Sequence, residues 1–195
     1  MKPAKILFLF VLSLFLTSST FAFDKYEIDP THSSIGFTVK HLVITKVNGK
    51  FKEFSGTLNY DEKDATKSFV EGKVKTASIS TDNEKRDAHL KSKDFFDAEK
   101  YPEIIFKSKK IINKNGNLTL VGDFTMHGVT KQIEIPIKIN GTVKDPWGSI
   151  RLGAEGNFTL NRQDYGVKWN QTLDNGGLLI SNDVEISLVV EAVKK

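Results

Sequence analysis

The sequence of 195 residues contains no cysteine, and this absence excludes several kinds of chemistry. Disulfide bonds cannot form, so packing and hydrogen bonds alone must hold the fold together. Thiolate nucleophiles and cysteine-ligated metal sites are excluded as well. After the first 22 residues the sequence also lacks a long apolar run, so no later segment is suited to cross a membrane as a helix.

A strong charge of one sign is missing too. The sequence has 28 basic and 24 acidic residues. Lys2 and Lys5 lie in an N-terminal segment that we expect to be removed, which leaves 26 basic against 24 acidic residues, a formal net charge of +2. Such a small surplus gives no electrostatic reason to expect a nucleic-acid partner.

The N-terminal segment has the pattern of a secretory signal peptide. Lys2 and Lys5 precede an apolar run at 6–17, which is too short for a membrane-spanning helix, and small residues follow at Thr20 and Ala22. We therefore expect cleavage after Ala22 and a periplasmic or secreted protein; an uncleaved anchor is the alternative. The remaining 23–195 has a length that suits a single domain.

Strict alternation of apolar and polar residues dominates the rest of the chain, and a period of two predicts β-strands. In the clearest case, 132–140, isoleucine occupies every odd position from 133 to 139. A short additional strand is expected at 25–29. Eight substantial strands are predicted at 33–42, 54–60, 69–74, 103–109, 117–126, 132–140, 149–160 and 183–192.

One segment, 80–102, interrupts this alternation and has helical features. Thr81 and Glu84 have the spacing of a capping box, and Pro102 does not allow a helix to continue. We expect one or two short helices, at about 82–100, that lie against the end of a sheet.

Eight strands that are each apolar on one face need a shared interior, which either a sandwich or a closed antiparallel barrel supplies. An eight-stranded barrel is either filled by side chains or holds one small ligand. Several positions on the apolar faces are small, which is consistent with sharp curvature of the sheet or with free space inside it. These small residues are Gly56, Gly72, Gly122, Ala154 and Gly156.

Five stretches of the sequence together resemble the YceI-like family, which comprises exported lipocalin-like proteins associated with binding polyisoprenoids and other long lipid chains. The resemblance covers nearly the whole of 23–195, and Tyr165 departs from it because other aromatic residues are common there. The stretches are DPTHSSIGFTVKHL (29–42), GKFKEFSGTL (49–58), TDNEKRDAHLKSKDFFDAEKYPEIIFKS (81–108), GDFTMHGVTKQIEIPI (122–137) and LNRQDYGV (160–167).

The resemblance implies an elongated eight-stranded lipocalin-like barrel with a hydrophobic tunnel, and a homodimer. The tail of a long-chain lipid would lie in the tunnel, with its polar head near one mouth. No other cofactor is expected. From the alternation, the wall of the tunnel is expected to include Phe37, Phe54, Leu58, Val74, Phe106, Leu120, Phe124, Ile135, Leu152, Phe158, Leu160, Ile186 and Leu188.

Three basic side chains are candidates to hold the polar head. Arg86 and His89 are three positions apart on the expected helix and therefore share a face. Arg162 continues the apolar parity of 158–160, which places a charge on a buried side of the strand. The alternative for each arginine is an ordinary structural role: Arg86 would pair with Asp82 or Asp87, and Arg162 with Asp164 or a backbone carbonyl.

No catalytic or metal-binding pattern is visible. The four histidines do not have the spacing of a zinc motif, and no serine lies in a Gly-x-Ser-x-Gly elbow. We therefore expect an exported binding protein rather than an enzyme, one that transports, stores or sequesters a lipid. Two alternatives stay open: a small outer-membrane barrel, whose apolar faces would point outward, and a lipid-modifying enzyme.

Overall fold

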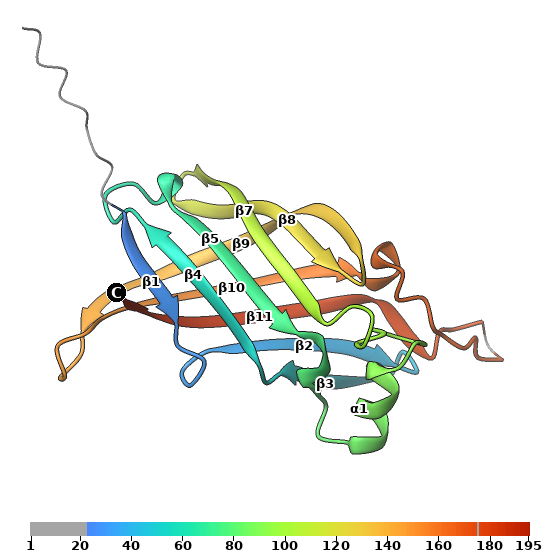
Figure 1. Cartoon of the computed structure of the whole chain (residues 1–195). Helices are drawn as coiled ribbons and strands as arrows, with labels where there is room; N and C mark the ends of the chain where they lie inside the picture. The colour runs from blue at the N-terminus through green and yellow to red at the C-terminus, as the bar shows by residue number, and fades with distance from the viewer. Residues whose placement is uncertain (1–22, 175) are drawn as a thin grey trace, which may run out of the picture.

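The computed structural model describes residues 23–174 and 176–195. The signal peptide expected at 1–22 lies outside the described residues. Within the described ranges the chain forms eleven antiparallel strands and one α-helix, together with three single turns of 3-10 helix (Figure 1). None of the helical segments there is long and apolar enough to cross a membrane.

Eight of the strands form a closed antiparallel barrel, as the sequence predicts (Figure 1). The ring is closed by the first and last strands, where Tyr26 lies opposite Lys194. In their order around the ring the strands are β1 (Asp24–Ile28), β4 (Phe54–Tyr60), β5 (Phe69–Lys75), β7 (Glu103–Lys114), β8 (Asn117–Met126), β9 (Val129–Lys144), β10 (Ile150–Asn161) and β11 (Ile180–Lys194).

Three further strands extend the sheet beyond this ring: β2 (Ser34–His41), β3 (Thr45–Phe51) and β6 (Ile79–Ser80). β2 pairs with β11 between Ile180 and Val189, whereas β1 pairs with the last residues of β11. The short strand expected at 25–29, β1, thus completes the ring of eight, while the strand expected at 33–42, β2, lies beside β11, and β3 was not predicted. The alternation of β3 is weak because Gly49 takes an inward place, where the ring of Phe37 leaves no room for a side chain.

A single α-helix, α1 (Glu84–Lys91), follows β6, and turns occupy the rest of the segment up to 102. The expected capping box does not form: Asn83 is the N-cap, and its side chain accepts a hydrogen bond from the Arg86 N–H at 2.9 Å. Thr81 instead donates to the carboxylate of Asp87 from its backbone N–H, at 2.8 Å, and from its hydroxyl. No residue of α1 is buried, so packing against the barrel fixes it only weakly.

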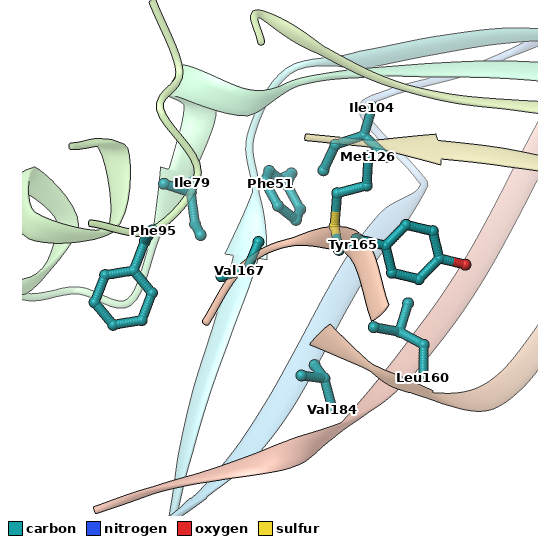
Figure 2. Packing of buried hydrophobic residues seen from close by; sticks show 9 residues of the cluster. All are labelled: Phe51, Ile79, Phe95, Ile104, Met126, Leu160, Tyr165, Val167 and Val184. Carbon is teal, nitrogen blue, oxygen red and sulfur yellow. The ribbon is translucent and has the colours of Figure 1, made fainter. Parts of the chain in front are cut away.

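The apolar side of the strands faces inward and forms three clusters along the barrel. One end is filled by Tyr26, Tyr60, Leu152 and Ala192. The middle holds Ile111, Leu120 and Ile135. At the α1 end, Tyr165 and Val167 pack among side chains from β3, β6, β7, β8 and β11, as Figure 2 shows; this cluster consists of Phe51, Ile79, Phe95, Ile104, Met126, Leu160, Tyr165, Val167 and Val184.

The small residues on the inner face serve both purposes that the sequence left open. Gly122 lies against the backbone at 107–108, beside a bulge in β7, so a side chain there would collide. At Gly72, by contrast, an added Cβ would meet only one atom within 4 Å, at 3.9 Å, and the residue borders free space. Curvature therefore explains Gly122, and interior space explains Gly72.

Candidate functional site

A cavity of about 750 Å³ runs along the interior of the barrel. It extends from Tyr60 and Leu152 at one end to α1 at the other, and its wall is almost entirely apolar. Because strands of the ring together with β2 and β3 surround it, the cavity belongs to the interior of the barrel rather than to a surface cleft. An enclosed apolar space of this size falls within the range of small-molecule sites, about 300–1,000 Å³.

Most of the side chains expected to form a tunnel wall do line this cavity. Phe54 does not: it is the first residue of β4, directly after the chain turns from β3, and among the described residues it is not part of the cavity wall, although its register partner Val74 is. The residues that line the cavity as expected are Phe37, Leu58, Val74, Phe106, Leu120, Phe124, Ile135, Leu152, Phe158, Leu160, Ile186 and Leu188.

Other lining residues were not predicted individually, and the reasons differ. Ile35 and Val39 share the parity of Phe37, so the alternation already contained that signal. Ile111 was hidden, because a register shift between Ser108 and Lys110 moves the inward face from even to odd positions. Trp169 comes from an irregular loop, where no periodicity exists to identify it.

The cavity reaches the surface beside α1. Asn83, Lys85 and Arg86 line it and are themselves exposed to solvent. His89 lies further in, with its ring edge-to-face against Phe95 and Trp169 at centroid distances of 5.0 Å, and its Nε2 is 3.0 Å from a carboxylate oxygen of Asp94. Around this mouth lie two of the three basic side chains proposed for a ligand head.

Arg86 is held by Thr81 and not by the carboxylates that the sequence offered as partners. Its Nε donates to the Thr81 hydroxyl at 2.7 Å, and its Nη2 donates to the Thr81 carbonyl at 2.9 Å. Among residues 23–174 and 176–195, no hydrogen-bond partner is found for Nη1. The guanidinium is thus oriented by neutral groups and keeps a full positive charge at the mouth.

Arg162 also lines the cavity, and its side chain is only 5 % exposed. Its Nε donates to the carbonyl of Ser181 at 3.0 Å, and its Nη1 donates to the carbonyls of Val167 and Trp169, both at 2.9 Å. Nη2 lies 3.5 Å from the side-chain oxygen of Asn182. Burial lowers the pKa of Arg162, and within the described ranges no carboxylate lies near enough to form an ion pair.

Arg162 and Asp164 do not continue the inward face of the strand, as the alternation suggested, because β10 ends at Asn161. A turn of 3-10 helix, η3 (Arg162–Tyr165), follows, and the side chain of Asn161 caps it by accepting from the Gln163 N–H at 3.0 Å. Asp164 consequently points away from Arg162 and pairs with Lys131 at 3.2 Å. Of the two structural partners considered from the sequence, the backbone carbonyls are right and Asp164 is wrong.

A second cluster of charges lies at the other end of β10. Arg151 bonds Asp145 at 2.8 Å, Asp29 at 3.0 Å and Glu191, while His32 Nδ1 is 2.8 Å from Asp29. The hydrogen bond from His32 holds the pKa of Asp29 far below its usual value, and the one from Arg151 lowers the pKa of Asp145. The hydrogen bonds of Arg151 to Asp145, Glu191 and Asp29 raise its own pKa.

This cluster has the composition of a metal site, but a cationic side chain already lies between its carboxylates. One ligand atom each from Asp29, His32 and Glu191 lies within 4.8 Å of the others. The guanidinium of Arg151, however, donates to both carboxylates and so supplies the positive charge that a metal ion would bring. Ser33, beside His32, donates its hydroxyl to the carbonyl of Glu191 at 3.1 Å and so does not face the imidazole as a nucleophile.

A family model described as the YceI-like domain matches residues 26–192, which is almost all of the described chain. The chain belongs to the YceI-like family. The resemblance found in the sequence is thereby confirmed. Among curated YceI-like relatives, a UPF0312 protein of Shewanella sp. strain ANA-3 is 40 % identical over 173 residues, which cover 87 % of each chain.

Solved structures show the same fold. The YCEI protein of Campylobacter jejuni is 32 % identical, with a TM-score of 0.70, and the match covers 80 % of this YceI-like chain and 90 % of the other. A polyisoprenoid binding domain from Saccharophagus degradans, implicated in plant cell wall breakdown, matches with a TM-score of 0.64 at 14 % identity, covering 87 % and 98 % of the two chains. At that identity, the second likeness concerns the fold alone.

Proposed function

We propose that this YceI-like protein binds a long-chain isoprenoid or another amphiphilic lipid, with the apolar tail in the barrel and the polar head at the α1 mouth. The observation that carries the proposal is the cavity of about 750 Å³ with an almost wholly apolar wall. The Saccharophagus domain of the same fold is described as polyisoprenoid binding, and for this reason an isoprenoid comes first among the candidate lipids.

The wall suits a hydrocarbon chain because it offers few polar partners to anything else. Each methylene transferred from water to such a wall contributes about 0.8 kcal/mol, so a long chain binds tightly without a single specific contact. The same wall disfavours a polar ligand, whose hydrogen bonds to water would be lost without replacement. The choice among lipid tails would therefore depend on how well the length and width of the tail match those of the cavity, and not on contacts with individual residues.

The basic side chains at the mouth would favour an acidic head such as a phosphate or carboxylate. Arg86 supplies the unused Nη1 and an exposed charge, so it is the candidate for direct contact. His89, with Asp94 already within hydrogen-bond distance of its Nε2, would line the entrance. Arg162 already donates its hydrogen bonds to backbone carbonyls, so it would attract an acidic head through the field of its buried charge rather than by direct contact.

The biological setting belongs to the same proposal. The N-terminal pattern supports export to the periplasm or medium, and a carrier, store or sequestering protein would need only the binding step. The family resemblance supports a homodimer. Edman sequencing of the purified protein tests whether processing occurs after Ala22, and light scattering tests the oligomeric state.

The decisive experiment is to purify the protein from a membrane-containing host and extract it with organic solvent for mass spectrometry. We expect a co-purifying lipid, and rebinding of an added prenyl phosphate or fatty acid after its removal. Ala154→Phe places a ring in the cavity and should reduce the bound lipid strongly, whereas Asn157→Phe adds the same bulk on the outer face of β10 and should not. A protein that carries no lipid and takes up none would refute the proposal.

A further inference from the structure

The turn between β2 and β3 carries two large apolar side chains in full contact with solvent. Val43 is 66 % exposed and Ile44 is 79 % exposed. The two residues lie at the tip of a hairpin that projects at the same end of the barrel as α1 (Figure 1). We call residues 42–44 the hairpin tip. Neighbouring aliphatic side chains on a projecting turn are costly to hydrate, so the exposure requires an explanation.

The backbone makes this choice of residues more unusual. The Ile44 N–H donates to the His41 carbonyl at 3.2 Å, and both central residues of the turn, Leu42 and Val43, have positive φ, 53° and 66°. Turns of this kind favour Asn-Gly, because a β-branched residue is strained at positive φ. The sequence therefore places apolar side chains at the one position where conformation favours polar or small ones.

Basic residues flank the hairpin tip. Lys40 and Lys46 are register partners in β2 and β3, two like charges side by side next to the turn. Lys46 bonds Glu185 at 3.1 Å, while no carboxylate of the described chain pairs with Lys40. Lys40 and Val43 also line a hollow of about 410 Å³ between the turn and β11, in which Asp183 is the one acidic member among the described residues.

The hairpin tip is continuous with the mouth of the barrel. His41 and Val47, which flank it in sequence, both line the internal cavity. On its other side the Leu42 N–H donates to the carbonyl of Leu179 at 2.9 Å, and Leu179 also lines the cavity. The turn thus projects from the rim of the opening through which a chain would enter.

We propose that the hairpin tip inserts into the surface of an anionic lipid bilayer and so brings the mouth of the barrel against that surface. Aliphatic side chains at the apex with lysines behind them match the two layers of such a surface, acyl chains below and acidic head groups above. A protein partner would need a groove to receive a convex tip, whereas a bilayer receives it without one. The inference goes beyond lipid binding in the cavity and does not depend on which lipid is held there.

Flotation of the purified protein with vesicles tests the proposal. We expect binding to vesicles of phosphatidylcholine mixed with phosphatidylglycerol, and weaker binding to phosphatidylcholine alone. Val43→Ser/Ile44→Ser should lower the partition coefficient about tenfold or more. Leu42→Asn/Val43→Gly should lower it as much while keeping or raising the melting temperature, since Asn-Gly suits the turn. Lys40→Glu should reduce binding to the anionic vesicles selectively.

The matched control lies at the other end of the barrel. Val143, near the end of β9, is 65 % exposed, and Trp147, in the turn between β9 and β10, is 84 % exposed; Figure 1 shows this turn at the end of the barrel away from α1. Val143→Ser/Trp147→Ser should leave flotation unchanged. The proposal is overturned if the wild-type protein does not float with anionic vesicles, if the hairpin-tip variants float as it does, or if the control variant loses as much.

The same samples separate this proposal from the proposed function. Lipid extracted from the hairpin-tip variants should equal that from the wild type, because the substitutions leave the cavity wall unchanged. Loss of flotation with the cavity lipid retained supports docking independently. Normal flotation without any extractable lipid would refute the cavity proposal and leave the docking proposal standing.

Discussion

Two arginines mark the two ends of β10, and their surroundings are opposite. Arg151, near the start of the strand, bonds three carboxylates and lies close to a histidine. Arg162, directly after its end, is more deeply buried and bonds backbone carbonyls and an amide. The pKa of Arg151 is raised by its partners, whereas the pKa of Arg162 is lowered by burial.

The difference follows from what each end of the barrel must do. At the Arg151 end, one guanidinium is surrounded by three carboxylates, which more than balance its charge, and the interior is closed by tyrosines. At the Arg162 end, the carbonyls fix the loop at 166–169 and leave the positive charge uncompensated beside the cavity. One arginine thus ties three carboxylates together at the closed end, while the other shapes a mouth and gives it a positive potential.

The largest effect is expected when Arg162, which donates hydrogen bonds to three backbone carbonyls, is replaced. Arg162→Met leaves the carbonyls of Val167, Trp169 and Ser181 without a partner, and each buried unpaired acceptor costs about 1–3 kcal/mol. We expect the free energy of unfolding to fall by about 3 kcal/mol or more, measured by urea denaturation. Arg162→Lys should recover only part of this, because an ammonium cannot reach three carbonyls in a plane. A loss below about 0.5 kcal/mol would contradict this account.

The second effect is smaller and depends on pH. Arg151→Met should lower stability at pH 7, because Asp29, Asp145 and Glu191 then face one another without a cation. The pKa values of Asp29 and Asp145 are depressed in the fold, so their stabilising contribution is present above the unfolded value of about 3.9 and is lost as pH falls. The difference between variant and wild type should therefore shrink below about pH 4.

Arg162→Met serves as the control for this titration. Its partners are uncharged between pH 3 and 8, so its cost should stay constant across that range. The two variants should also differ in their dependence on salt. Added salt screens the charges around Arg151, so the stability lost in Arg151→Met should shrink, whereas the hydrogen bonds of Arg162 to carbonyls should be unaffected. Parallel pH profiles for the two variants would contradict the comparison.

A third, weaker effect is expected at the edge of the charged cluster. His32→Ala removes the largest cause of the low pKa of Asp29, so that pKa should rise toward its usual value. The acid-induced loss of stability linked to Asp29 should then be smaller, because the folded and unfolded values lie closer together. NMR titration of the Asp29 carboxyl carbon measures the shift directly; an unchanged pKa would assign the depression to Arg151 and the Thr31 N–H instead.

The smallest effect is expected at Asp164. Its pair with Lys131 at 3.2 Å is exposed on both sides, and such pairs contribute little. Asp164→Asn should change the free energy of unfolding by less than about 0.5 kcal/mol in thermal or urea denaturation. A large loss of stability would instead support the ion pair between Asp164 and Arg162 that the sequence suggested.

The alternation of the strands made the barrel and most of its wall predictable. A period of two is a property of each strand by itself, so Phe158 or Ile186 can be assigned an inward side without a structure. Prediction failed where that local rule ends. A bulge in β7 moves the inward side from even to odd positions before Ile111. In β3, Gly49 has no apolar side chain to continue the alternation, because the ring of Phe37 from the neighbouring strand fills that space.

The site at the mouth was less predictable, because its chemistry depends on contacts between segments. The types of residue were visible, and Arg86, His89 and Arg162 do line one cavity. Their partners were not visible: Thr81 for Arg86, and carbonyls from one loop and from β11 for Arg162. Backbone acceptors carry no sequence signature, so a pattern of side chains cannot reveal them.

The division of β11 between β1 and β2 gives the barrel one end of fixed circumference and one end with a free edge. Outside the ring, β3 is joined to β6 by only two register pairs, Lys50 with Ser80 and Phe51 with Ile79. Widening the α1 end therefore requires the separation of this short ladder, while all eight seams of the ring stay intact. If a long chain enters and leaves at this end, as proposed, its exchange would not require the ring itself to unfold.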